Sequence, residues 1–338
     1  MPAISILIPC YNAATTVDEA LSSLAGQTLT DFEVLLVDDG STDGTLDRLQ
    51  DWSRRDPRFR VFSRPHAGII SALNAGLESC RSDFIARMDA DDRSAPHRLR
   101  RQVDLLNEHP EIVVISSLVK GFPEDALGIE FRAYIDWLNT LLTDEDIKRG
   151  IFLQSPLAHP SVAYQRLWVE QVGGYQDRGW AEDYDLWLRL YLAGANFGKV
   201  PEVLLEWRDH PRRLIHTDGR YSKHSDLCLK AYYLAHGPLS SSREVIIWGT
   251  GADAYQLSAQ LHSLGCMVSA YVVSQRDRLS RPDQTAPILS PVEVLERLRS
   301  EKRPIVLVVE NDPLRRALIA QQLETLRLYQ GIDWWLVG

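Results

Sequence analysis

Four short apolar runs, separated by segments with helical spacing, place the strongest limit on how the N-terminal part of this chain can fold. The runs cover residues 3–8, 32–37, 60–63 and 84–86. Runs of this length that are rich in apolar and branched side chains are typical of strands buried on both faces of a parallel sheet. Because the predicted strands alternate with predicted helices, the pattern indicates a doubly wound α/β domain.

Carboxylates follow two of these predicted strands directly. Asp38 and Asp39 come after the second run, and Asp89 and Asp91 come after the fourth. Because open α/β sheets bind ligands beyond the carboxyl ends of their strands, we expect both pairs to face one crevice. Closely spaced carboxylates repel one another, and a bound Mg²⁺ or Mn²⁺, which prefers oxygen ligands, would relieve that repulsion. The alternative for each pair is an ordinary solvated turn.

The composition excludes several classes of protein. The chain has 338 residues and a formal net charge of −9, which argues against a nucleic-acid platform and gives no support for an anionic-membrane surface. Its four cysteines are scattered, so we expect neither a zinc site nor a disulfide framework. We also expect no signal peptide and no transmembrane segment, and therefore a cytoplasmic protein. Peripheral membrane association and a homo-oligomer stay open.

A series of motifs accompanies the strand pattern. They occupy residues 5–12, 37–45, 88–92, 98–103, 106–110, 159–161, 173–175 and 181–190. In this order and spacing they resemble the motifs of family 2 glycosyltransferases, over roughly residues 3–215. The resemblance implies a GT-A nucleotide-diphospho-sugar transferase fold with a doubly wound mixed sheet. It also implies transfer of a sugar from a nucleoside-diphosphate sugar, expected to be UDP-linked, to a hydroxyl of a carbohydrate or lipid-linked acceptor in bacterial cell-envelope or exopolysaccharide synthesis.

The resemblance assigns the nucleotide side of the site to the ends of the first two predicted strands. It implies that Pro9, Tyr11 and Asn12 line the nucleotide pocket. It further implies that Asp39 binds the base and that Asp38 supports it. These side chains would hold the donor in the crevice at the sheet edge.

The resemblance assigns the reacting side to three other acids. Asp89 and Asp91 would form the metal motif, with Asp91 in direct contact with Mn²⁺ or Mg²⁺. Asp183 would be the general base that deprotonates the acceptor hydroxyl, and a single displacement would invert the anomeric centre. The chemistry agrees, because a sugar hydroxyl is a poor nucleophile without a base and a departing diphosphate needs its charge neutralised. Glu182 and Asp183 also open a predicted helix, where acids complement the helix dipole, and for Glu182 we favour that role.

Two histidines and one departure from the family pattern complete the predicted site. His159 is expected in a loop on the acceptor side, and His210 either near the metal and diphosphate or in an exposed loop. Leu73 stands where the family often carries an arginine. Arg64 or His66 would then supply positive charge near the phosphates.

The C-terminal part is predicted to be a separate module. We expect a GT-A domain over residues 1–236, a linker over 237–242 and a small Rossmann-like α/β domain over 243–338. Residues 249–254 read Gly-x-Gly-x-x-Ala after a predicted strand, as in dinucleotide-binding folds. Ser274 stands where such folds carry an acid for the ribose, so we favour a structural or partner-binding role.

Three alternatives compete with sugar transfer. The first is a non-catalytic nucleotide-sugar-binding or scaffold protein that acts through its C-terminal domain. The joint presence of Asp39, Asp89, Asp91 and Asp183 argues against it. The second is a nicotinamide-dependent oxidoreductase, which the serine at position 274 disfavours. The third is nucleotidyl transfer, which would leave the acids at the start of the helix near Asp183 unexplained.

Overall fold

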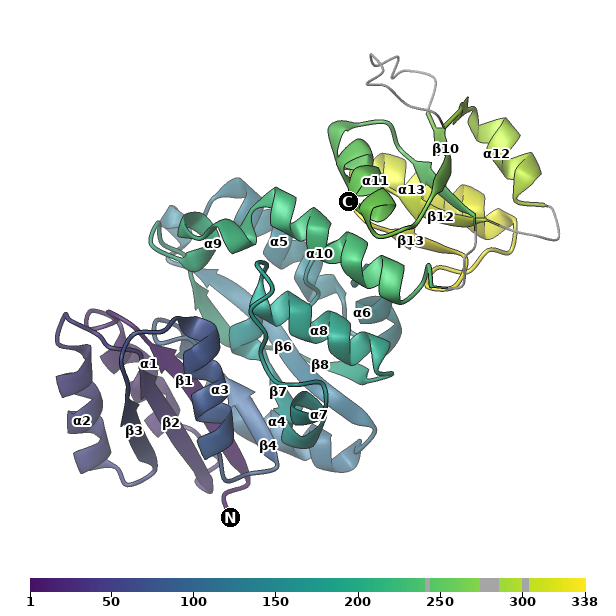
Figure 1. The fold of residues 1–338 in the computed structure, drawn as a ribbon. Helices are drawn as coiled ribbons and strands as arrows, with labels where there is room; N and C mark the ends of the chain where they lie inside the picture. The colour runs from purple at the N-terminus through teal and green to yellow at the C-terminus, as the bar shows by residue number, and fades with distance from the viewer. Residues whose placement is uncertain (241–243, 274–285, 300–303) are drawn as a thin grey trace. The chain divides into compact units, whose positions relative to one another are not determined.

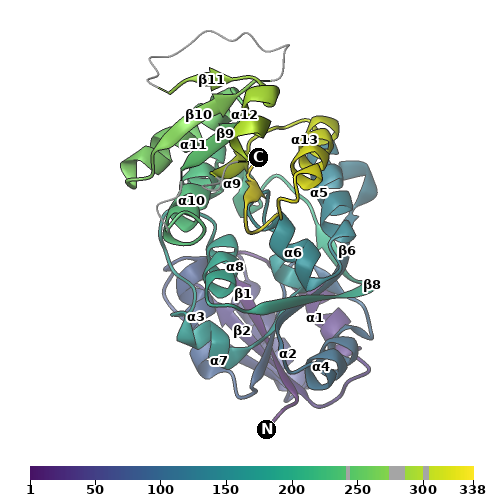
Figure 2. The same ribbon diagram turned by 90° about the vertical axis from the view of Figure 1, so that its right-hand side faces the viewer.

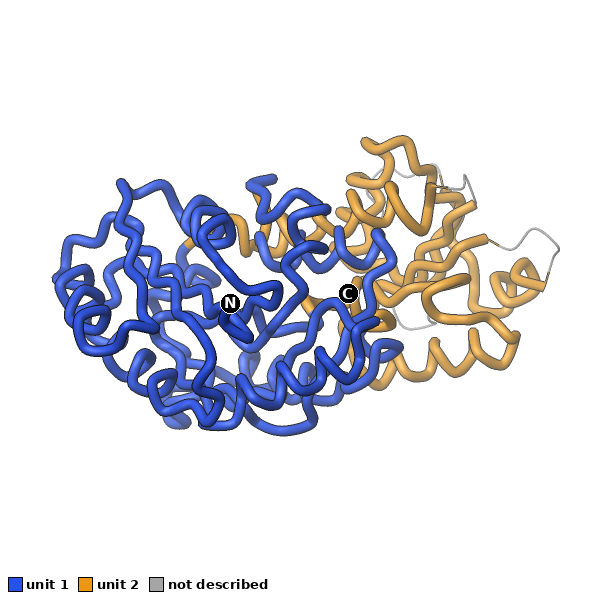
Figure 3. Tube along the Cα trace, turned by 90° about the horizontal axis from the view of Figure 1, so that it is seen from below, with its two compact units in different colours: residues 1–147, 156–178, 182–217 blue, residues 148–155, 179–181, 218–338 orange. Residues whose placement is uncertain are grey.

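The computed structural model describes residues 1–240, 244–273, 286–299 and 304–338 (Figures 1 and 2). Proximity of Cα atoms divides the chain into two compact units (Figure 3). Unit 1 comprises Met1–Ile147, Pro156–Arg178 and Glu182–Thr217, and unit 2 comprises Lys148–Ser155, Gly179–Ala181 and Asp218–Gly338. The end of the predicted linker and Ser274 lie outside the described residues, and the predicted domain boundaries stay a prediction.

Unit 1 is built on a mixed eight-stranded sheet with the order β3-β2-β1-β4-β7-β6-β8-β5. Its strands are β1 (Ile4–Cys10), β2 (Phe32–Asp38), β3 (Phe59–Ser63), β4 (Phe84–Arg87), β5 (Arg93–Ser94), β6 (Ile112–Phe122), β7 (Ala163–Gln165) and β8 (Asn196–Arg208). The first four strands pair in parallel, whereas β7 runs antiparallel to both β4 and β6. The predicted mixed, doubly wound α/β sheet is therefore confirmed.

Helices cover this sheet and bury both of its faces. They are α1 (Val17–Ala25), α2 (Thr45–Arg55), α3 (Ile69–Ser79), α4 (Arg98–Glu108), α5 (Ile129–Thr140), α7 (Arg166–Gln171), α8 (Glu182–Leu192) and α9 (Leu214–Thr217), while α6 (Asp144–Gly150) spans the unit boundary. Ile6 of β1 shares a core cluster with Leu21 of α1, whereas Leu7 points to the other face, against α3. Burial on both faces explains why the β1 sequence is apolar without alternation.

Gly76 allows α3 to lie directly against β1. A Cβ at this position would lie 2.0 Å from a Leu7 methyl carbon and 3.0 Å from a Val37 methyl carbon. Overpacking a core costs about 1–3 kcal/mol, and the better helix propensity of alanine offsets about 1 kcal/mol. Because a Cβ only 2.0 Å from Leu7 forces the core to shift, we take the upper end of this cost and expect Gly76→Ala to lower the free energy of unfolding by about 2 kcal/mol in denaturant titrations. Glu78→Ala, on the exposed face of the same helix, is the control; equal stability of the two variants would contradict this packing.

Unit 2 contains a five-stranded sheet with the order β11-β10-β9-β12-β13, and all its strands are parallel. The strands are β9 (Val245–Trp248), β10 (Val268–Val272), β11 (Ile288–Leu289), β12 (Ile305–Val308) and β13 (Trp334–Leu336). The helices are α10 (Lys223–His236), α11 (Ala252–Ser263), α12 (Pro291–Arg297) and α13 (Pro313–Thr325). The strand order proceeds outward from β9 in both directions, as in doubly wound folds. Within the described ranges, no helix has the length and apolar character needed to cross a membrane.

Candidate functional site

The acidic loop lies directly after β4, at the sheet edge where the strand pattern predicted it. Asp89, Asp91 and Asp92 each place a carboxylate oxygen within 4.8 Å of the other two. Burial and the neighbouring carboxylates raise the pKa of Asp92 well above its usual value, and burial also raises the pKa of Asp89. Oδ2 of Asp92 is buried and has no hydrogen-bond partner among the described residues. Three converging oxygens, one of them buried and unpaired, fit a hard divalent cation.

The end of β8 holds the acidic loop in place. The Arg208 amide donates to Oδ1 of Asp92 at 2.8 Å, and Nε of Arg208 donates to the Asp91 carbonyl at 2.7 Å. Just beyond the strand, Nε2 of His210 lies 2.8 Å from Oδ2 of Asp91. The structure therefore places His210 beside the acidic loop, which was one of its two predicted locations.

The residues predicted for the nucleotide pocket lie at the carboxyl ends of β1 and β2 and in the loops that follow. Pro9 pairs with Val37 in the parallel register of these strands. The Asn12 amide donates to Oγ of Ser41 at 3.0 Å, and Oδ1 of Asn12 accepts from the Thr42 amide at 2.9 Å. Asn12 therefore fixes the loop after β1 to the loop after β2.

Asp39 connects these loops to the start of α3. Its carboxylate is almost fully buried and accepts from the amides of Ala67 at 3.1 Å and Gly68 at 2.8 Å. Nδ1 of His66 lies 2.8 Å from Oδ2 of Asp39, and the His66 ring stacks on Tyr11 with a centroid distance of 4.1 Å. Tyr11 is half exposed. The arrangement offers a flat aromatic surface beside a carboxylate acceptor, a combination suited to a nucleobase.

The two residues considered as replacements for the arginine that the family often carries have different partners. His66 contacts Asp39, as described above. Arg64 donates to the carbonyl and the hydroxyl of Ser71, both at 2.6 Å, and its Nε lies 3.7 Å from Oδ1 of Asp39. Both side chains therefore support the carboxylate predicted to bind the base.

Asp183 lies in the first turn of α8. Burial and repulsion from Glu182 raise the pKa of Asp183 to about 7, and Arg87 partly offsets them. The Tyr184 amide donates to Oδ1 of Asp183 at 2.7 Å, which orients the carboxylate. A carboxylate with a pKa near 7 can accept a proton at neutral pH and is well matched to general-base catalysis.

Arg87 is the candidate residue that the sequence reasoning missed. It ends β4, is buried and forms an ion pair with Asp89. Its charge also acts on the pKa of Asp183, at the start of α8. Arg87 is therefore a buried cation between the acidic loop and the predicted base. A basic residue in an otherwise apolar strand was the available signal, because a buried charge needs partners.

A buried polar network supports the start of α8. Nδ1 of His159 lies 3.8 Å from Oε1 of Glu182, and Nε2 of His159 lies 3.0 Å from the Tyr175 hydroxyl. The side-chain amide of Asn74 donates to the Tyr175 carbonyl at 2.8 Å and accepts from the Tyr175 amide at 2.9 Å. Burial, together with the charge of Arg87, lowers the pKa of His159, so this imidazole is neutral at pH 7. Glu182, predicted only to complement the helix dipole, is itself buried against this network.

Comparisons with known proteins identify the family to which this chain belongs. The family model described as glycosyl transferase family 2 matches residues 5–168. The amylovoran biosynthesis glycosyltransferase AmsE of Erwinia amylovora is 33% identical over 207 residues, which cover 60% of this chain and 75% of the relative. The UDP-Gal:alpha-D-GlcNAc-diphosphoundecaprenol beta-1,3-galactosyltransferase of Escherichia coli is 28% identical over 210 residues, covering 61% of this chain and 74% of the relative.

A solved structure resembles the fold. The S. aureus TarS fragment 1-349 in complex with UDP-GlcNAc superposes with a TM-score of 0.56 at 18% identity, covering 77% of this chain and 71% of that chain. Because the identity is low, this likeness concerns the fold alone. The family model over residues 5–168 and the AmsE match, 33% identical over 75% of that relative, lead to one assignment: the chain belongs to glycosyl transferase family 2.

Proposed function

We propose that this enzyme transfers a sugar from a UDP-sugar to an acceptor hydroxyl, with inversion and with the help of a divalent cation. The observation that carries the proposal is that Arg87 interacts with two acidic sites: it forms an ion pair with Asp89, and its charge lowers the pKa of Asp183. One is the cluster of Asp89, Asp91 and Asp92, and the other is Asp183, whose pKa of about 7 suits a base. Cation binding and proton abstraction are the two tasks that this reaction requires.

The donor would lie across the loops after β1, β2 and β4. Asp39 would accept from an N–H of the base, and Tyr11 would offer its exposed face for stacking. Asp91 would hold Mn²⁺ or Mg²⁺, together with Asp89. When bound, such a cation neutralises the charge that grows on a departing diphosphate. The names of the relatives, which include a UDP-galactose donor, favour UDP.

The acceptor would meet Asp183 on the other side of the sugar. As the acceptor oxygen attacks the anomeric carbon, Asp183 takes its proton, and the bond to the diphosphate breaks on the opposite face. One displacement of this kind inverts the anomeric centre. A double displacement would need a second carboxylate close to the reacting carbon, and Glu182 is instead buried against His159. The relatives' names favour a carbohydrate or lipid-linked acceptor in polysaccharide synthesis.

Calorimetry on the full chain tests the proposal. UDP, GDP and ADP, with matching nucleotide sugars, are titrated in Mn²⁺ and in EDTA. We expect the uridine compounds to bind most tightly in Mn²⁺, and the product's anomeric configuration, determined by NMR, to be opposite to that of the donor. Absence of any nucleotide binding that depends on Mn²⁺ would overturn the proposal and favour a scaffold protein that acts through its C-terminal domain.

The rate should depend on pH through Asp183. Since only the deprotonated carboxylate can accept a proton, kcat/KM should rise about tenfold per pH unit below the pKa and level off above about pH 7. The measurement is kcat/KM across that range at constant free Mn²⁺, with the donor dissociation constant followed in parallel. A flat rate profile with unchanged donor affinity would contradict the assignment of Asp183 as base.

A further inference from the structure

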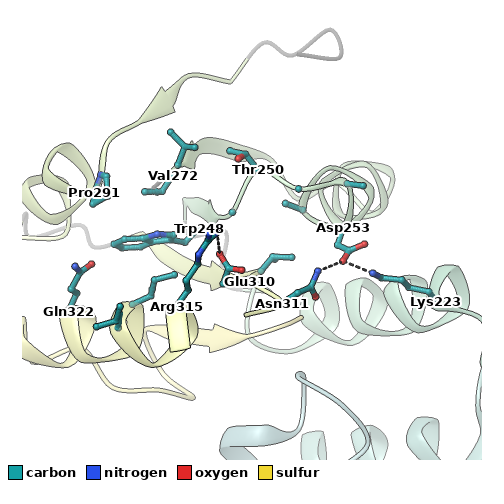
Figure 4. Close-up of a pocket in the computed structure, with 18 residues that line it drawn as sticks. Lys223, Trp248, Thr250, Asp253, Val272, Pro291, Glu310, Asn311, Arg315 and Gln322 are labelled. Atoms are coloured by element: carbon teal, nitrogen blue, oxygen red, sulfur yellow. Dashed lines mark hydrogen bonds and ion pairs between the residues drawn. The ribbon is translucent and has the colours of Figure 1, made fainter. Parts of the chain in front are cut away.

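A cavity of about 500 Å³ lies in unit 2, at the carboxyl ends of β9, β10 and β12 (Figure 4). Its walls come from the loop after β9, from the ends of β10 and β12, and from α13. β9 is the strand at which the sheet order reverses, with β10 on one side and β12 on the other. Doubly wound sheets bind ligands at this point, because the connections there leave in opposite directions and open a crevice.

The two glycines of the loop after β9 have different reasons to be glycine. Gly249 has a φ of 148°, and a Cβ there would lie 2.2 Å from the Val309 carbonyl oxygen, so the fold itself requires glycine. Gly251 has an ordinary extended conformation (φ −75°, ψ 173°), and a Cβ there would meet no atom within 4 Å. The fold places no demand on Gly251. Its missing side chain leaves bare backbone on the cavity wall, where a ligand can approach closely.

Thr250, between these glycines, is a second sign of a ligand. Its side chain lines the cavity (Figure 4) and the residue is 7% exposed. No hydrogen bond from its hydroxyl to another residue is found in the described parts of the chain. The Thr250 hydroxyl is therefore available to hydrogen-bond a polar group bound in the cavity.

The charged residues that line the cavity form two groups: Asp253 with Lys223, and Glu310 with Arg315. Asp253 accepts from Nζ of Lys223 at 2.6 Å and from Nδ2 of Asn311 at 3.1 Å. Burial favours a higher pKa for Asp253, but these donors outweigh it and lower the pKa, so this carboxylate is neutralised within the protein. Arg315 of α13 and Glu310 also line the cavity, 3.8 Å apart.

The register of β9 and β12 places Glu310 at the level of the glycine loop. Val308 pairs with Trp248, so Glu310 and Thr250 each lie two residues beyond a paired position. Glu310 therefore lies beside the glycine loop, where its carboxylate can accept hydrogen bonds from the hydroxyl groups of a bound ribose. Ser274, which stands after β10 where such an acid is more often found, lies outside the described ranges.

We propose that this cavity binds the diphosphate and ribose of a nucleotide, independently of the transfer site in unit 1. The amides of Thr250, Gly251 and Ala252, at the N-terminus of the 12-residue helix α11, would donate to the phosphate oxygens, whereas the Gly249 amide is already bonded to the Val272 carbonyl. Arg315 supplies positive charge beside them, and Glu310 accepts from the ribose. Nucleoside diphosphates, nucleotide sugars and dinucleotides share this chemistry.

The test uses the full chain carrying Asp39→Ala and Asp91→Ala, which removes the predicted donor contacts of unit 1. ADP, UDP, UDP-glucose and NAD⁺ are titrated separately by calorimetry in EDTA, and the tightest of them identifies the ligand class. Gly251→Val, added to this background, should weaken that binding at least about tenfold, because its side chain fills the space left for the phosphate.

Gly128→Val is the matched control. Gly128 also precedes a 12-residue helix, α5, with φ −65° and ψ 154°, and a Cβ there meets no atom within 4 Å. It should leave nucleotide binding unchanged, whereas Arg315→Gln should weaken it. Failure of all four probes to bind, or equal affinity of the Gly251→Val and Gly128→Val proteins, would overturn the proposal. Because unit 1 is disabled in this background, neither outcome depends on the transfer reaction.

Discussion

Asp183→Asn is expected to lower kcat by about 10²–10⁴-fold while leaving nucleotide affinity nearly unchanged. Asparagine keeps the size and the position of the side chain in the first turn of α8, but it cannot accept the proton of the acceptor hydroxyl. Since the residual reaction no longer titrates a carboxylate with a pKa of about 7, the rise of the rate through neutral pH should also vanish. Steady-state kinetics at several pH values, together with calorimetry of UDP in Mn²⁺, measure both effects.

Asp185→Asn, two residues further along α8, is the control for Asp183→Asn. Asp185 is fully buried and paired with Arg189 at 2.7 Å. Loss of the Asp185 charge should lower the midpoint temperature of thermal unfolding, because Arg189 loses its charged partner. It should leave kcat largely unchanged at temperatures where the protein stays folded. If Asp183→Asn retained wild-type kcat, or lost nucleotide affinity as strongly as kcat, Asp183 could not be the base.

Asp91→Asn is expected to remove the Mn²⁺-dependent part of nucleotide affinity and to lower kcat by about 10²–10³-fold. The substitution takes one anionic oxygen from a cluster that also includes Asp89 and the buried Asp92, and it leaves His210 beside a neutral amide. Hard divalent cations bind weakly where charged oxygens are few. The measurement is the ratio of UDP dissociation constants in EDTA and in Mn²⁺, which should fall toward one.

Asp104→Asn provides the charge-matched control, because Asp104 lies on the exposed face of α4. It should keep the full Mn²⁺ effect. A Mn²⁺ effect that survives in Asp91→Asn would move the cation away from the acidic loop. Loss of all UDP binding in Asp91→Asn, even in EDTA, would show instead that the substitution disturbs the loops after β1 and β2.

The arrangement of strands in unit 1 was predictable to the extent that it follows from local patterns. The continuous apolar runs of β1 and β2 indicated strands buried on both faces, and the acids that follow β2 and β4 were expected at one edge. The antiparallel insertion of β7 between β4 and β6 was not foreseen. The strand β7 has only three residues, which is too short for an alternating pattern to identify it as a strand. Its pairing with β4 and β6 also depends on how distant segments of the chain meet in the folded sheet.

The sequence by itself determined which residue types stand at the ends of strands and helices, and therefore where Asp89, Asp91 and Asp183 had to lie along the chain. Only the tertiary structure decided their surroundings. It placed Arg87 between the acidic loop and α8 and buried His159 behind Glu182. The physical reason is that local sequence sets backbone periodicity. The charge state of a buried group depends on the solvent it loses and on partners from distant segments, which meet it only when the chain is folded.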